Sequence, residues 1–193
     1  MVNKESIDKE RIIKILTDAF EYNKSINYIV KQDSRKKDRI RSLMEYSVAV
    51  CELFGEVYLT DDKNACALLL YPQLKKTTLK TILLDIKLIF KSIGITGIGK
   101  TLSRESKIKS IQPKEAMSYL WFIGTDPNAQ NKGIGTKLMQ QIISVSNEKK
   151  LPLYLETSTV ENLKWYNNFQ FEIYDELQLD YKLFFLKRKP DNF

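Results

Sequence analysis

Hydrophobic and polar positions along the chain follow two periods, and the changes of period divide the chain into helices and strands. Apolar residues at helical spacing predict helices over residues 7–22, 35–54, 78–93, 132–147 and 161–169. Alternating or continuously apolar runs predict strands over 56–60, 65–71, 118–124, 153–157, 171–179 and 181–187. Because helices and strands alternate, we expect a mixed α/β architecture.

Residues 94–115 interrupt this pattern, since few of them suit a core. They predict a basic, weakly helical connection between strands. Residues 63–117 hold 11 basic and 3 acidic side chains, whereas the whole chain has 31 and 24. A solvated helix face is one explanation of this excess, and attraction of a polyanionic ligand to one end of a cleft is another. The short basic run 187–189 is expected to be solvated.

Composition narrows the chemistry. The 193 residues include no histidine and only two cysteines, Cys51 and Cys66. Ser-His-Asp and Cys-His catalysis are therefore excluded, and no metal site is expected. The first residues carry no secretory signal and no apolar run reaches bilayer length, so we expect a cytoplasmic protein without a membrane partner. No motif that reads nucleic acid accompanies the basic segment, and no nucleic-acid partner is expected.

The stretch from Tyr119 to Leu138 carries the strongest candidate chemistry. An apolar strand is followed by a Pro-marked turn, a loop with Gly133 and Gly135, and the start of a helix. The first amides of a helix lack intrahelical acceptors, and the helix dipole adds a partial positive charge at the same end. This junction is thus expected to bind an anion such as a phosphate.

Two motifs in this order resemble the GCN5-related N-acetyltransferase (GNAT) superfamily. Gln130-x-x-Gly133-x-Gly135 matches the family signature between strand and helix, and Asn162, Tyr166 and Phe171 match a later pattern. The chain departs from that pattern at Gln170, where the family usually has Gly. The resemblance implies a single domain over 1–193. It also implies a central mixed sheet of about six to seven strands flanked by helices, with a splayed pair of parallel central strands.

The resemblance also implies a site for acetyl-coenzyme A as cosubstrate. Main-chain groups of Phe122, Ile123 and Thr125 would hold the pantetheine arm and thioester, and Asn162 would contact the coenzyme. Backbone amides of the loop after Gln130 would bind the pyrophosphate; the loop residues are Asn131, Lys132, Gly133, Ile134, Gly135 and Thr136.

Acetyl transfer by direct attack of an amine needs a base for the amine and an acid for the departing thiolate. Tyr166 would lie near the sulfur, and a phenol of pKa ~10 is close enough to a thiol of pKa ~8.5 to serve as the acid. Its alternative role is a packed aromatic. Glu115 and Glu156 are the candidate bases, although each could be a surface charge and a water chain could replace both.

Other functions stay open at this point. The acceptor is expected to be a primary amine of a small molecule or peptide, and a homodimer is left open. A non-catalytic coenzyme A-binding module would keep the same loop without turnover. Residues 94–101 also satisfy the P-loop pattern GxxxxGK[ST], which would indicate a nucleotidase. A P-loop needs a buried strand before it, however, and residues 78–93 predict a helix.

Overall fold

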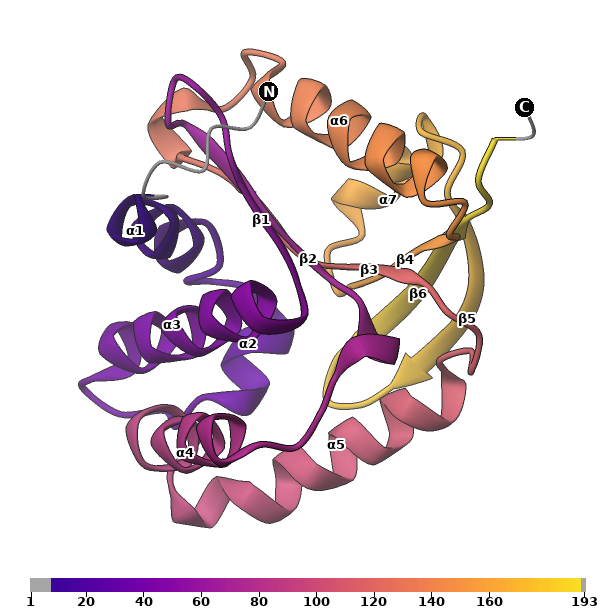
Figure 1. The fold of residues 1–193 in the computed structure, drawn as a ribbon. Helices are drawn as coiled ribbons and strands as arrows, with labels where there is room; N and C mark the ends of the chain where they lie inside the picture. Colours follow the sequence, from indigo (N-terminus) through magenta and orange to yellow (C-terminus); the bar gives the residue numbers. More distant parts are fainter. Residues whose placement is uncertain (1–7, 192–193) are drawn as a thin grey trace.

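The computed structural model describes residues 8–191 as one six-stranded mixed sheet with helices on both faces (Figure 1). The strands are β1 Gly55–Leu59, β2 Ala65–Leu70, β3 Ser118–Thr125, β4 Leu153–Thr157, β5 Glu172–Gln178 and β6 Lys182–Arg188. The helices are α1 Lys9–Ala19, α2 Lys24–Ile29, α3 Lys36–Phe54, α4 Leu79–Leu88, α5 Ile98–Ile111, α6 Ile134–Glu148 and α7 Glu161–Asn167. The sheet order is β1-β2-β3-β4-β6-β5, and only β3 and β4 run parallel. The mixed α/β fold expected from the sequence is confirmed.

The two faces of the sheet hold separate cores. Helices α1 and α3 pack on one face with Cys66, Leu68 and Leu70 of β2. Helix α6 packs on the other face, where alternate β2 residues such as Ala67 and Leu69 point. Because both faces are covered, every residue of β2 is buried, which explains its continuously apolar sequence.

A β-bulge at Trp121 changes which face of the sheet the side chains of β3 point to. Leu68 pairs with Phe122 and Leu69 with Leu120, so Trp121 is the extra residue. Leu120 therefore packs toward α6, while Phe122 packs toward α1 and α3. Residues two apart on a regular strand share a face, so only the bulge can separate them. The apolar character of 118–124 predicted a strand buried on both sides but gave no sign of the bulge.

β3 and β4 diverge soon after they meet. Their parallel ladder covers only Ser118 with Leu153 and Tyr119 with Tyr154, although β3 continues to Thr125 and β4 to Thr157. From Leu120 onward, the β4-facing edge of β3 has no strand beside it. The splayed pair of parallel strands implied by the resemblance is thus confirmed.

Residues 94–115 differ from the expected weakly helical connection. They contain the 14-residue helix α5, which packs Arg104 and Ile108 inward. Two buried positions in four turns leave too weak a periodicity to recognise from sequence. The short helix α2 was also missed, because its six residues bury only Ile26.

The basic run 187–189 was expected to be solvated, which is wrong for Arg188 but not for the exposed Lys189. Arg188 is buried, and its guanidinium donates to the carbonyl of Phe169 at 3.0 Å and to Asp191 at 2.6 Å. It also donates to Asn147 of α6 at 3.3 Å. The side chain thus joins the end of β6 to neighbouring elements, which a three-residue charge run could not reveal.

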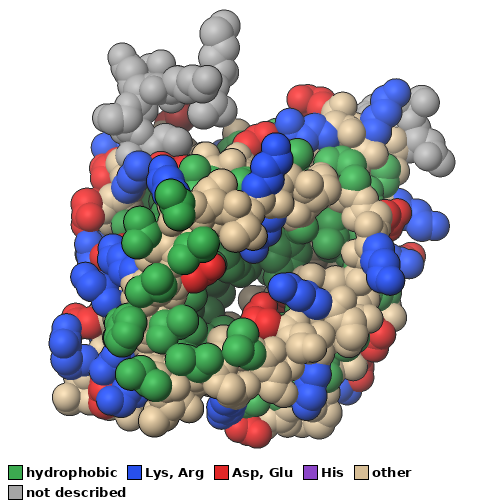
Figure 2. Space-filling view, turned by 60° about the horizontal axis from the view of Figure 1, so that its bottom comes forward, with side chains coloured by type: hydrophobic (Ala, Val, Ile, Leu, Met, Phe, Trp, Pro, Cys, Tyr) green, Lys and Arg blue, Asp and Glu red, His purple; other side chains and the backbone are tan. Residues whose placement is uncertain are grey.

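The P-loop-like residues 94–101 follow a helix, as the sequence predicted. A π-helical turn, Ile89–Ile93, extends α4, and a 3-10 turn then leads into α5. Among residues 8–191, no helix is both long and apolar enough to cross a membrane. Helix α4 buries no side chain completely, and hydrophobic side chains gather on this side of the molecule (Figure 2).

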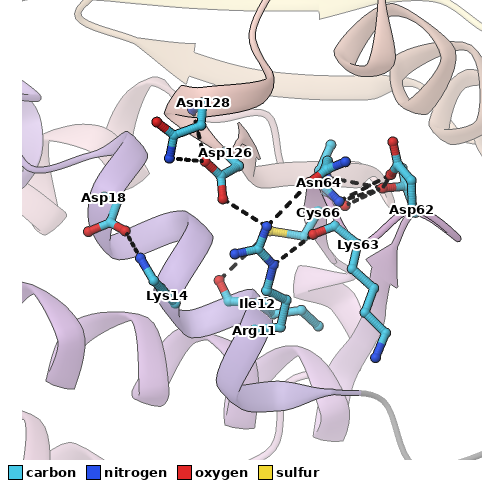
Figure 3. A network of polar contacts seen from close by, with 12 residues as sticks. Arg11, Ile12, Lys14, Asp18, Asp62, Lys63, Asn64, Cys66, Asp126 and Asn128 are labelled. Atoms are coloured by element: carbon cyan, nitrogen blue, oxygen red, sulfur yellow. Dashed lines mark hydrogen bonds and ion pairs between the residues drawn. The ribbon is translucent and has the colours of Figure 1, made fainter.

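Arg11 of α1 ties the first helix to the start of the loop after β3 (Figure 3). Its guanidinium donates to the Lys63 carbonyl at 2.8 Å, to Asn64 Oδ1 at 3.3 Å and to Asp126 Oδ2 at 2.7 Å. Asp126 in turn accepts from the amide of Asn128 at 2.9 Å. This amide and the Arg11 charge hold the pKa of Asp126 below its ordinary value.

Replacing Arg11 by Ala should lower the free energy of unfolding by about 1–3 kcal/mol, because Asp126 and the Lys63 carbonyl lose their donor. Urea denaturation at neutral pH measures this. The difference in free energy of unfolding between wild type and variant should shrink as the pH falls below ~4. A carboxyl whose pKa is lowered by folding stabilises fully above its unfolded pKa and loses this contribution as the pH falls through its folded pKa. Lys14→Ala removes an exposed pair with Asp18 on the same helix and should cost less than about 0.5 kcal/mol. Equal losses in the two variants would contradict the role of Arg11.

Candidate functional site

Two cavities meet where β3 and β4 diverge. The first, here called the loop cavity, has a volume of about 650 Å³ and follows the segment from Ala129 to Thr136. The second, here called the inner cavity, has a volume of about 340 Å³ and extends between β3, β4, α3 and α5. The residues that line both are Phe20, Asn23, Ile123, Thr159, Asn162 and Tyr166.

The loop cavity is built by the Gly-containing turn that the sequence singled out. Asn131 and Gly133 both have left-handed backbone, with φ of 62° and 72°. Gly133 is the N-cap of α6, and no side chain caps that helix. The first amides of α6 therefore have neither an intrahelical acceptor nor a side-chain cap, and they remain available to an anion.

The two glycines of this turn serve different purposes. A Cβ on Gly133 would meet no atom within 4 Å, so the space beside this backbone is open to a ligand. A Cβ on Gly135 would lie 3.2 Å from Thr125 Oγ1, so here a glycine lets α6 approach β3 closely. Trp165 of α7 donates to Thr136 Oγ1 at 3.5 Å and links a third element to the turn.

The predicted cofactor-binding residues lie together around this cavity. Ile123, Thr125, Gln130 and the loop 131–136 line it, as does Asn162 from the start of α7. Phe122 lines the inner cavity instead and packs edge to face on Phe20, with ring centroids 5.1 Å apart. The bulge at Trp121 and the missing neighbour strand leave backbone groups here outside the regular ladder, and such groups can bind an extended ligand.

Tyr166 stands between the two cavities. Its ring packs against Trp165 and Phe171, with centroids 5.0 and 5.7 Å away, and the residue is only 6% exposed. Burial raises the pKa of its phenol above the ordinary value. Among the described residues no hydrogen bond occupies its hydroxyl, which is thus a neutral O–H donor on a residue that lines both cavities.

Glu156 is the candidate base that lines the inner cavity, where Glu105 of α5 is a second carboxylate. It lies on β4 just beyond the last residues paired with β3, and accepts hydrogen bonds from Tyr119 and, at 2.7 Å, from Gln112 Nε2. Burial raises the pKa of Glu156 above its ordinary value, although the two hydrogen bonds and the nearby charge of Arg104 oppose the shift. A carboxylate in this state is suited to proton transfer.

Glu115, the other candidate base, lies elsewhere. It is exposed, accepts from the Tyr154 hydroxyl at 2.7 Å, and lines neither cavity. The fold therefore brings Glu156 and Tyr166 to one cavity but leaves Glu115 outside it. Within residues 8–191, no group of three or more His, Cys, Asp or Glu side chains is arranged to hold a metal ion.

Helix α5 supplies polar residues that sequence analysis missed. Arg104 is buried at the wall of the inner cavity and donates to Tyr181 Oη at 2.9 Å and to Ser25 Oγ at 2.6 Å. Gln112, at the end of the same helix, holds Glu156. The basic segment 63–117 thus contributes to the inner cavity, whereas the loop cavity has no lining residue from it.

Comparison with known proteins identifies the segment that carries the motifs. Residues 96–171 match the family model described as Acetyltransferase (GNAT) family. This range includes the Gln130–Gly135 signature as well as Glu156, Asn162 and Tyr166.

Solved structures extend the likeness to the whole fold. A Corynebacterium glutamicum protein described as histone acetyltransferase HPA2 and related acetyltransferase superposes with a TM-score of 0.69 at 15% identity, over 99% of this chain and 96% of that one. Arylalkylamine N-acetyltransferase 2 from Aedes aegypti superposes with a TM-score of 0.61 at 14% identity, over 97% of this chain and 98% of that one.

The C-terminal condensation domain of Ebony, solved with beta-alanyl-dopamine, gives a TM-score of 0.67 at 9% identity, over 94% of this chain and 93% of that one. At such identities the structures show the shared fold alone. Together with the family match over 96–171, they confirm the sequence resemblance: this segment matches the GNAT family, and the described residues share the fold of the solved GNAT acetyltransferases.

Proposed function

We propose that this protein is an acetyl-coenzyme A-dependent N-acetyltransferase acting on a primary amine of a small molecule. The observation that carries the proposal is the meeting of the two cavities beside Tyr166, where β3 and β4 separate. The loop cavity suits the acetyl donor and the inner cavity suits the amine acceptor. The two reactants would therefore meet beside the phenol of Tyr166 and near the carboxylate of Glu156.

The loop cavity has the properties that a coenzyme A site requires. Uncapped amides at the start of α6 would bind the pyrophosphate, and the open space beside Gly133 leaves room for it. The free edge of β3 at Phe122 and Ile123 would receive the extended pantetheine arm. Acetyl-coenzyme A supplies the activated acetyl group when bound.

Tyr166 and Glu156 would divide the proton transfers. Burial raises the pKa of Tyr166, so its phenol is protonated when the carbon–sulfur bond breaks. It would then give its proton to the departing thiolate and regain one, through water, from the nitrogen of the new amide bond. Glu156 would accept a proton from the ammonium of the acceptor, directly or through water, to give the neutral amine that attacks the thioester. Tyr119, whose pKa burial raises well above 10, remains a donor that orients Glu156.

The inner cavity favours a small acceptor over a peptide. Its volume of about 340 Å³ lies at the small end of ligand pockets. Tyr46, Trp121 and Phe122 contribute aromatic surface, and Glu105 and Glu156 contribute carboxylates. An amine with an apolar body fits this combination, and the structural likeness to an arylalkylamine N-acetyltransferase supports the same class.

Two alternatives differ in what they bind. A coenzyme A-binding module without turnover would use the loop cavity alone. A nucleotidase would use residues 94–101, but these lie between helices, so the strand that a P-loop requires is absent from this part of the described chain.

Acetyl-coenzyme A should raise the melting temperature of the protein by several degrees at a concentration far above its dissociation constant, because it binds only the folded state. ATP with magnesium at the same concentration should give no comparable shift. Differential scanning fluorimetry measures both. A shift with ATP alone would overturn the coenzyme site and favour the nucleotidase.

Replacing Tyr166 by Phe should lower kcat for acetylation about 100-fold or more, since a proton donor for the thiolate is lost while the ring packing is kept. Thiol release measured with a chromogenic disulfide over a panel of small amines gives the rate. The thermal shift with acetyl-coenzyme A should be unchanged in this variant. Wild-type kcat in the variant would exclude the acid role of Tyr166.

Replacing Glu156 by Gln should lower kcat/KM by about 100-fold or more and remove its low-pH limb. The wild-type rate should fall as the pH drops through the pKa of Glu156, which lies above the ordinary 4.5 because of burial. Glu115→Gln is the matched comparison and should keep both rate and profile. If Glu156→Gln behaves like wild type, a water chain serves as the base instead.

A further inference from the structure

Helix α4 presents an apolar stripe to solvent. Leu79, Leu83, Ile86 and Phe90 follow one another at spacings of three or four residues, so they share one face of the helix and of the turn that extends it. Leu79 is 82% exposed, Leu83 67% and Phe90 64%. Figure 2 shows hydrophobic side chains gathered on this side of the molecule, next to a hollow in its surface.

The opposite side of α4 explains why the helix lies where it does. Leu84 and Leu88 pack against the core formed by α1 and α3, and Leu88 also lines the inner cavity. Asp85 is held by the Tyr46 hydroxyl at 2.8 Å. Packing thus satisfies one face only, and the exposed stripe is additional to what the fold needs.

Lysines border this stripe. Lys80, Lys87 and Lys91 each follow a residue of the stripe by one position, which places them along its flank, and Lys75 and Lys76 precede the helix. Lys87 pairs with Glu45 at 3.2 Å. For Lys75, Lys76, Lys80 and Lys91, no acidic partner lies within ion-pair distance among the described residues.

This pattern selects the kind of surface that could cover α4. Two copies of a lysine-bordered face would repel each other, whereas an anionic surface would attract it. The four side chains of the stripe line neither of the two cavities described above, so they suit insertion into a deformable layer rather than a shaped partner. A helix with an apolar face bordered by Lys is typical of binding in the plane of a membrane interface.

We propose that the α4 face, defined as residues 75–91, binds an anionic membrane surface. The expectation of no membrane partner rested on the absence of a bilayer-length apolar run, which peripheral binding does not require. The lysines would lie at the headgroups and the stripe just below them. Since the same helix borders the inner cavity, that cavity would lie beside the lipid interface.

Vesicle co-sedimentation of the full chain tests this proposal. The protein should sediment with vesicles of phosphatidylcholine and phosphatidylglycerol, much less with phosphatidylcholine alone, and less as salt is raised. The double variant Leu83→Glu, Phe90→Glu should reduce the partition coefficient at least about tenfold, since two inserted side chains are lost. Lys80→Glu with Lys91→Glu should reduce it by a similar factor.

Matched controls separate the face from general effects. Ile173→Glu changes an exposed apolar residue on β5, and Lys189→Glu a lysine outside the face; both should bind vesicles like wild type. Each variant should keep the wild-type melting temperature, which shows that it is folded.

Three outcomes would overturn the proposal. The first is no binding to anionic vesicles. The second is a wild-type dimer in sedimentation velocity that Leu83→Glu, Phe90→Glu dissociates, which would assign the face to a second copy. The third is binding to vesicles and to soluble polyglutamate alike that does not depend on Leu83 and Phe90, which would assign it to charge alone.

Discussion

The separation of β3 from β4 is the constraint on which the site depends. A parallel pair normally satisfies its backbone groups along its whole length, but here the ladder covers two positions before the strands part. Backbone groups exposed inside a protein need partners from elsewhere. The gap between β3 and β4 is therefore lined by polar backbone groups within an otherwise apolar sheet. Helices α5, α6 and α7 surround this gap, and their side chains determine which ligand it can bind.

Much of the fold could be predicted because the chain obeys simple periods where burial is strong. Every residue of β2 is buried, and its sequence is apolar throughout. Helix α6 shows its inward face through Leu138, Met139 and Ile142. Prediction failed where burial is sparse: α5 buries only Arg104 and Ile108, and one of these is charged, so neither its helicity nor its contact with the site appeared in the pattern.

The candidate site was predictable in part for a similar reason. The loop 130–136 works through its backbone, which leaves glycines at fixed spacing, and such a signature can be recognised locally. Glu156 was one of two equivalent carboxylates in the sequence, and only the fold separates it from Glu115. Tyr119 and Gln112 act on Glu156 from a neighbouring strand and a distant helix, and no local pattern could join them.

The hydrogen bond from Tyr119 to Glu156 also holds β3 and β4 in place relative to each other. It joins the last paired residue of β3 to a residue of β4 just beyond the ladder, and Gln112 at the end of α5 donates to the same carboxylate. These two hydrogen bonds fix the point at which β3 and β4 separate, so the distance between the strands is set before a ligand binds. When a cleft is already open, little of the binding free energy is lost in reorganising the protein. The rigidity of the cleft between β3 and β4, rather than any motion of the sheet, would then govern how well two reactants are aligned in the cleft.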